Sequence, residues 1–176
     1  MRKLTTLSLC LLLTATIATA EETKKKKPLS PPATAEAKIG GRNITVNYNA
    51  PSKRERVIMG ELVPYGQIWR TGANAATTFT TDGDLMIGSV HVPAGSYSLF
   101  TIPGEKEWTL IINKQTGQSG TQHDAAQDLG RTTMKVAAVK DTVETFAIDV
   151  KPAGAKSGTL SLTWENTTAT VPVMVH

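Results

Sequence analysis

The sequence predicts an all-β protein, a single antiparallel β-sandwich of jelly-roll-like or Ig-like architecture. Residues 36–176 consist of short runs in which apolar and polar side chains alternate, as in strands with one buried face. Glycine, proline, asparagine and aspartate separate these runs, and no stretch has the apolar spacing of a long helix. Turns at intervals of about eight to twelve residues favour a domain of about eight to ten strands.

The predicted strands follow the alternating runs in order. These runs span 44–48, 85–87, 90–92, 97–102, 108–112, 146–150, 160–164 and 171–175. Gly88 fits a tight hairpin between the second and third runs, and Gly104 fits a turn before the fifth. The runs 98–102 and 110–112 are apolar at successive positions, so both of their faces should be buried. They are therefore predicted to be the central strands.

Residues 1–20 are predicted to be a secretory signal peptide. They begin with Arg2 and Lys3, continue as an apolar run over 4–13, and end in the small-x-small pattern ATA at 18–20. The run is too short to span a membrane, so no transmembrane segment is expected. The protein is therefore expected to be exported, to the periplasm or the extracellular space. Its single cysteine leaves with the signal peptide, which excludes disulfides and thiol chemistry from the mature chain.

Residues 21–35 are predicted to be a disordered linker because they are rich in lysine and proline and have no run that could join a core. Their four lysines, Lys24 to Lys27, fit a solvated tail or a weak association with anionic lipid or polymer of the envelope. From Glu36 onward the chain has 13 Lys+Arg and 13 Asp+Glu, so the net charge of the predicted domain is zero. This balance argues against nucleic acid as a partner.

Two long segments, 60–74 and 115–131, fall outside the strand pattern, and long loops on a β scaffold often carry function. The first contains the candidate ligand-binding residues Tyr65, Trp69, Arg70 and Asn74. The aromatic rings could stack on a ligand, the guanidinium could hold a carboxylate or phosphate, and the amide could bond a sugar. In the structural alternative, Trp69 plugs one end of the sandwich, Arg70 pairs with Glu61 or Asp82, and Gly72 and Asn74 supply turn geometry.

Other charged residues give weaker signals. Arg54 and Arg56 are typical of a solvated surface, and they become interesting only if one of them converges on Arg70. His91 and His123 are far apart in the sequence and have no cysteines near them, so no metal site is expected. The sequence has no P-loop, no dinucleotide fingerprint and no nucleophile elbow, so no cofactor and no catalytic residue is assigned.

Four blocks of the sequence resemble a family of exported bacterial proteins, the domain of unknown function numbered twenty-nine eleven. The blocks are GELVPYG at 60–66, WRTGAN at 69–74, AGSYSLFTIP at 94–103 and EW at 107–108. The resemblance covers most of residues 36–176 and implies one compact, exported, β-rich domain. It implies no reaction, cofactor or catalytic residue.

The chain also departs from the pattern of that family. Many relatives have an acidic residue at the position of Ala75, and they often have tryptophan and tyrosine at the positions of Ser119 and His123. If these positions matter for activity, this member is altered.

The function expected from the sequence is non-catalytic binding of a small polar or carbohydrate-like ligand, or of an envelope partner. The balanced charge, the missing catalytic signatures and the cluster of Tyr65, Trp69, Arg70 and Asn74 support it. The alternative is a hydrolytic enzyme in which Arg70 holds an anionic intermediate and His91 or His123 is the base. A purely structural envelope protein is the third possibility.

Overall fold

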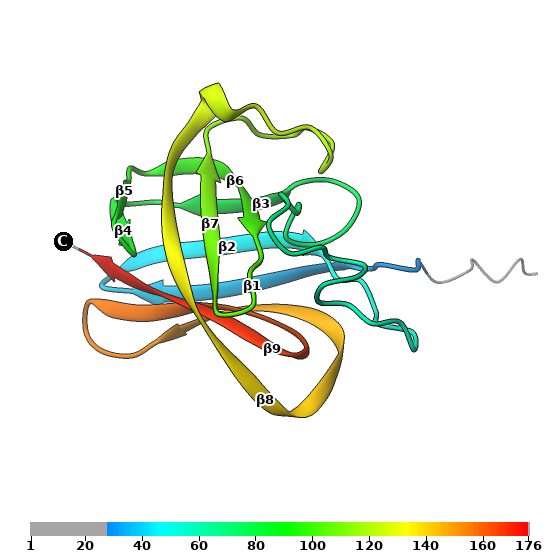
Figure 1. The fold of residues 1–176 in the computed structure, drawn as a ribbon. Coiled ribbons are helices and arrows are strands. Elements are labelled where there is room, and N and C mark those ends of the chain that lie inside the picture. The colour runs from blue at the N-terminus through cyan, green and yellow to red at the C-terminus, as the bar shows by residue number, and fades with distance from the viewer. Residues whose placement is uncertain (1–27, 176) are drawn as a thin grey trace, which may run out of the picture.

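A computed structural model describes residues 28–175, and these form one nine-stranded antiparallel sheet (Figure 1). The sheet order is β1-β2-β3-β6-β7-β8-β9-β4-β5. The strands are β1 (Pro32–Ile39), β2 (Arg42–Asn49), β3 (Thr77–Thr81), β4 (Leu85–Ile87), β5 (Val90–Val92), β6 (Gly95–Ile102), β7 (Glu107–Asn113), β8 (Asp128–Pro152) and β9 (Ser157–Val175). The predicted all-β class is confirmed.

Hydrogen bonding joins every strand into this one sheet and does not divide it into two, so the finer jelly-roll-like or Ig-like architecture stays a prediction. The predicted signal peptide and Lys24 to Lys27 lie outside the described residues. Within 28–175, no helix has the length and apolarity needed to cross a membrane.

The predicted hairpins and central strands are present. Ile87 of β4 pairs with Val90 of β5, and Gly88 makes the turn between them with φ +56°. Strands β6 and β7 occupy the middle of the sheet order, and both of their faces are largely buried. On the second face, Phe100 and Ile111 are register partners that form a small core beneath the loop between β7 and β8. That loop contains a 3₁₀ turn at Ala125–Gln127.

The last two strands are much longer than the sequence pattern predicts. The 25 residues of β8 and the 19 of β9 form a curved pair that contains three of the predicted runs, and the pair crosses the front of Figure 1. Register shifts between Ala138 and Ala147 interrupt the pairing. Most side chains from 135 to 145 are partly or fully exposed, so this part of β8 has no apolar face and gave no alternating signal.

The predicted boundary at residue 36 is wrong. Strand β1 begins at Pro32, which pairs with Asn49, so the last part of the predicted disordered linker belongs to the sheet. Pro32 is tolerated because it is the first residue of an edge strand, where its missing N–H removes no essential ladder bond. Ala35 and Ile39 face the main core, but small alanines alternating with polar residues give a weak strand signal.

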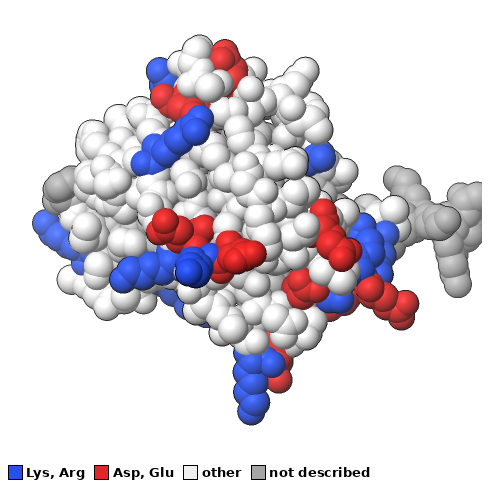
Figure 2. All heavy atoms as spheres, viewed as in Figure 1, with Lys and Arg blue, Asp and Glu red and all other residues white. Residues whose placement is uncertain are grey.

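Charges of both signs are interspersed on the face seen in Figure 2, with wide uncharged areas between them. This agrees with the zero net charge counted from Glu36 onward. The N-terminal end of the described chain lies on the same side of the molecule as the loop between β2 and β3 (Figure 1).

Candidate functional site

The loop between β2 and β3 carries the residues that the sequence singled out, and backbone bonds fix it to the sheet. The N–H of Trp69 donates to the Thr101 carbonyl at 2.7 Å, and the N–H of Thr101 donates back to Trp69 at 2.9 Å. Thr71 follows in the left-handed region, at φ 54°, and its carbonyl accepts from the Thr77 hydroxyl at 2.7 Å. The WRTGAN block is therefore held against the central strand β6.

A carboxylate anchors the other half of this loop. Glu165, in the middle of β9, accepts the backbone N–H of Ile58 at 3.3 Å and of Met59 at 3.2 Å. The Nζ of Lys53 lies 3.6 Å from the same carboxylate. Buried Ile58 and Val63 then join the main core beneath the loop. The loop is thus packed on the fold along much of its length.

Trp69 is half-buried and belongs to an aromatic cluster. Its ring centroid lies 5.0 Å from that of Phe146, 5.9 Å from that of Trp164 and 6.2 Å from that of Trp108. The first and last contacts are edge-to-face, and the ring stacks on Trp164 at 18°. These contacts support the structural role for Trp69, but part of the ring stays open to a surface hollow.

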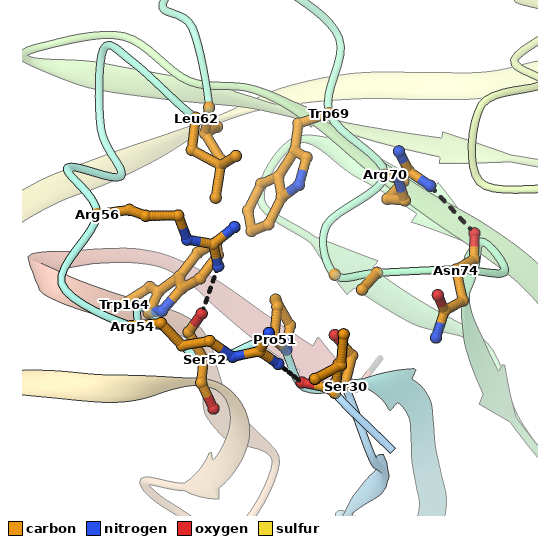
Figure 3. Close-up of a pocket in the computed structure, with 14 residues that line it drawn as sticks. Ser30, Pro51, Ser52, Arg54, Arg56, Leu62, Trp69, Arg70, Asn74 and Trp164 are labelled. Atoms are coloured by element: carbon orange, nitrogen blue, oxygen red, sulfur yellow. Dashed lines mark hydrogen bonds between the residues drawn. The ribbon is translucent and has the colours of Figure 1, made fainter.

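This hollow, which we call the arginine hollow, has a volume of about 390 Å³. Its walls come from the segment just before β1, from the β2–β3 loop and from β9. The lining residues are Leu29, Ser30, Pro51, Ser52, Arg54, Arg56, Leu62, Val63, Trp69, Arg70, Gly72, Ala73, Asn74 and Trp164. Figure 3 shows the rings of Trp69 and Trp164 between the arginine side chains. Arg54 and Arg56 therefore line the same hollow as Arg70, the convergence that the sequence could not establish.

The three guanidinium groups in the arginine hollow bond backbone carbonyls. Arg54 donates to the Leu29 carbonyl, and Arg56 donates to the Ser52 carbonyl at 2.6 Å and the Lys53 carbonyl at 2.9 Å. None of the three forms an ion pair with a carboxylate in residues 28–175, and no aspartate or glutamate lines the hollow. Glu144 accepts the backbone N–H of Arg54 at 2.9 Å, so this carboxylate bonds the main chain of Arg54. The three guanidinium groups themselves bond no carboxylate among the described residues and keep donors that suit an anion.

Arg70 is half-buried, and its Nη1 lies 3.4 Å from the Asn74 carbonyl, a long hydrogen bond. The structural alternative paired it with Glu61 or Asp82, and neither pair forms. Asp82 instead accepts the backbone N–H of Asn43 at 2.8 Å. The stem of Arg70 packs on Gly120, where an added Cβ would lie 2.5 Å from the Arg70 Cδ. Arg70 is thus held by packing of its aliphatic stem, and its guanidinium forms no ion pair with an acidic side chain in residues 28–175.

Asn74 and Tyr65 differ from their predicted binding roles. Asn74 has φ 60°, and its carbonyl accepts from the Gly120 N–H at 3.1 Å as well as from Arg70, so its backbone shapes the loop. Its side chain is exposed at the edge of the arginine hollow (Figure 3). Tyr65 is 41% exposed, packs against Gly60 and lines neither this hollow nor the next one.

A second hollow, the histidine hollow, lies on the other side of Trp69 and Arg70. It has a volume of about 450 Å³ and is lined by Leu62, Pro64, Gln67, Ile68, Trp69, Arg70, Gly120, Thr121 and His123. Residues of both long loops, 60–74 and 115–131, which the sequence predicted to carry function, therefore line this hollow. Within the described part of the chain, no carboxylate lines this hollow.

His123 is oriented by a buried hydrogen-bond network. Its Nε2 lies 2.8 Å from Asp128, and the ring packs edge-on against Phe100. Asp128 also accepts from Asn113 at 2.8 Å and from Arg131 at 2.7 Å. Burial alone would raise the pKa of Asp128, but the bonds from Asn113, Arg131 and His123 outweigh it and hold the pKa below its usual value.

The sequence missed several residues that build the site. Trp164, Leu62 and Asp128 gave no local signal, because each is an ordinary strand or loop residue until the fold brings it to Trp69 or His123. His91 is on β5 and lies 3.5 Å from Asp84, and it lines neither hollow. No group of three or more metal-ligating side chains was found among residues 28–175.

Comparison with known proteins gives a family but no activity. No curated protein and no solved structure matches the chain. Residues 30–173 match the family described as "Protein of unknown function (DUF2911)". The start of that match agrees with a strand β1 that begins at Pro32. The chain therefore belongs to the DUF2911 family.

Proposed function

We propose that the protein is an exported, non-catalytic binding domain whose ligand is a small polar molecule that carries an anionic group. One observation carries this proposal: Arg54, Arg56 and Arg70 line one hollow, and their guanidinium groups form no ion pair with a carboxylate among the described residues. A carboxylate or phosphate would receive charge-assisted hydrogen bonds there, in place of the weaker bonds to carbonyls.

The walls of the arginine hollow support a carbohydrate-like ligand. The ring of Trp69 and the side chain of Leu62 offer apolar surface, and Ser52 and Asn74 offer hydrogen-bonding groups at the edge. A sugar acid combines an apolar ring face, hydroxyl groups and a carboxylate, so it matches all three kinds of wall. An envelope polymer that carries such units fits the same chemistry.

The test compares two probes that differ in one group, glucuronate and glucose, by isothermal titration calorimetry. We expect glucuronate to bind and glucose to bind at least about tenfold more weakly, since a hydrogen bond to a charged group contributes roughly 1.5–3 kcal/mol. Arg56→Gln should weaken glucuronate binding by a similar factor. Arg42→Gln, an exposed arginine on β2 outside the hollow, is the matched control and should change nothing. Equal binding of both probes, or an unaffected Arg56→Gln, would contradict the proposal.

The hydrolytic alternative keeps one supporting observation, because Arg70 and His123 line the same hollow. In the neutral tautomer that donates its Nε2–H to Asp128, the lone pair of His123 lies on Nδ1, as a general base requires. Chromogenic esters, phosphates and glycosides test this reading. Turnover that His123→Gln abolishes would establish an enzyme, and its absence across the panel would leave the binding function.

A further inference from the structure

We propose that the arginine hollow and the histidine hollow are neighbouring subsites of one elongated site, which binds an oligomer of an acidic sugar. This inference rests on the proposed function, because it places the anionic unit in the arginine hollow. It adds a second unit, in the histidine hollow, and so assigns a ligand longer than one sugar ring.

Three residues belong to both hollows. Leu62, Trp69 and Arg70 line each of them, so their side chains form the ridge between the two spaces. The ring of Trp69 cannot swing freely, because it stacks on Trp164 at 5.9 Å and meets Phe146 at 5.0 Å. A ligand that crosses from one hollow to the other would therefore pass over a fixed aromatic surface, which suits the apolar face of a sugar ring.

The polar groups of the two hollows differ in kind. The arginine hollow offers three guanidinium donors. In the histidine hollow, His123 bonds Asp128 through Nε2, and the neutral tautomer that donates this bond has an acceptor at Nδ1. The exposed hydroxyl of Thr121 and amide of Gln67 add donors and acceptors.

The ligand that complements these groups has a carboxylate on one unit and hydroxyl donors on the next. The volumes, about 390 and 450 Å³, are of similar size, which fits repeating units. Among the described residues, no carboxylate that would repel a chain of acidic units lines either hollow, and Arg70 lies at the boundary, where it can contact the second carboxylate. An oligomer of a uronic acid has this arrangement of groups.

The experiment measures affinity against ligand length on the predicted mature chain, residues 21–176, with galacturonate and its linear dimer and trimer as probes. We expect the dimer to bind roughly tenfold or more tightly than the monomer, because the unit bound in the arginine hollow holds the second unit close to the histidine hollow. The trimer should add little to the dimer.

Variants assign the gain to the second hollow. Thr121→Val and His123→Gln should reduce the difference between dimer and monomer, because they weaken binding of the dimer more than binding of the monomer. Thr121 is exposed, so its variant tests the site even if His123→Gln lowers stability through Asp128. Arg56→Gln should weaken all three lengths, and His91→Gln, outside both hollows, should weaken none.

The outcomes separate this inference from the proposed function. Equal affinity for the three lengths would overturn the elongated site and leave the anion site in place. No binding of glucuronate or of any galacturonate length would overturn both. A gain with length for glutamate peptides, without one for the galacturonates, would overturn the assignment of a sugar.

Discussion

Replacing Trp69 by alanine tests whether one ring serves both the core and the candidate site. The ring is half-buried and contacts three aromatic rings at 5.0–6.2 Å. A fully buried tryptophan contributes about 3–5 kcal/mol to the free energy of unfolding relative to alanine. Each aromatic pair contributes about 0.5–1.5 kcal/mol beyond the burial of its surface. Since part of the ring is open to two hollows, we expect Trp69→Ala to lower the free energy of unfolding by about 2–3 kcal/mol.

Urea unfolding followed by circular dichroism is the assay. With a slope near 2 kcal/mol/M, the expected loss moves the midpoint down by roughly 1–1.5 M. Trp69→Phe keeps an aromatic ring and should lose about half as much. Tyr65→Ala, at an exposed ring that lines neither hollow, is the control and should lose less than about 0.5 kcal/mol.

Two results would refute this reasoning. A loss below about 0.5 kcal/mol for Trp69→Ala would mean that the ring is not part of the core. A stable Trp69→Phe variant that binds glucuronate as well as the unchanged protein would mean that the indole does not form the wall of the site. A folded Trp69→Phe variant with weakened binding is the outcome that we expect.

Three further predictions concern the supports of the site. Glu165→Gln weakens the anchor of the β2–β3 loop, so the amide of Ile58 should exchange hydrogen faster while the central strands keep their protection. Gly120→Ala brings a Cβ to 2.5 Å from the stem of Arg70, so it should destabilise the fold by about 1–3 kcal/mol and weaken glucuronate binding, as unfolding and calorimetry would show. The pKa of Asp128 is lowered in the folded state, so its carboxylate stabilises the fold above the ordinary pKa, and this is lost as pH falls through the lowered value. The stability difference between the unchanged protein and Asp128→Asn should therefore be largest near neutral pH and shrink in acid, and a difference that is constant with pH would contradict it.

The candidate site was only partly visible in the sequence. Trp69 and Arg70 line both hollows, and Asn74 lines one, but Tyr65 lines neither. The aromatic and cationic composition of the loop gave the signal, and composition does not report which way a side chain points. Asn74 has φ 60° and acts chiefly through its carbonyl, which agrees with the turn geometry that the structural alternative assigned to it.

Alternation of apolar and polar residues determined the all-β class and the hairpin at Gly88, because period-two burial is a local property of a strand. Successive apolar residues determined the central position of β6 and β7, whose two faces are both largely buried. The start of β1 and residues 135–145 of β8 escaped these patterns, since their side chains are small or exposed. Only the tertiary structure placed Arg56 and Trp164 beside Trp69, and His123 beside Arg70. These residues are far apart in the chain, and no local pattern encodes the strand order and loop packing that bring them together.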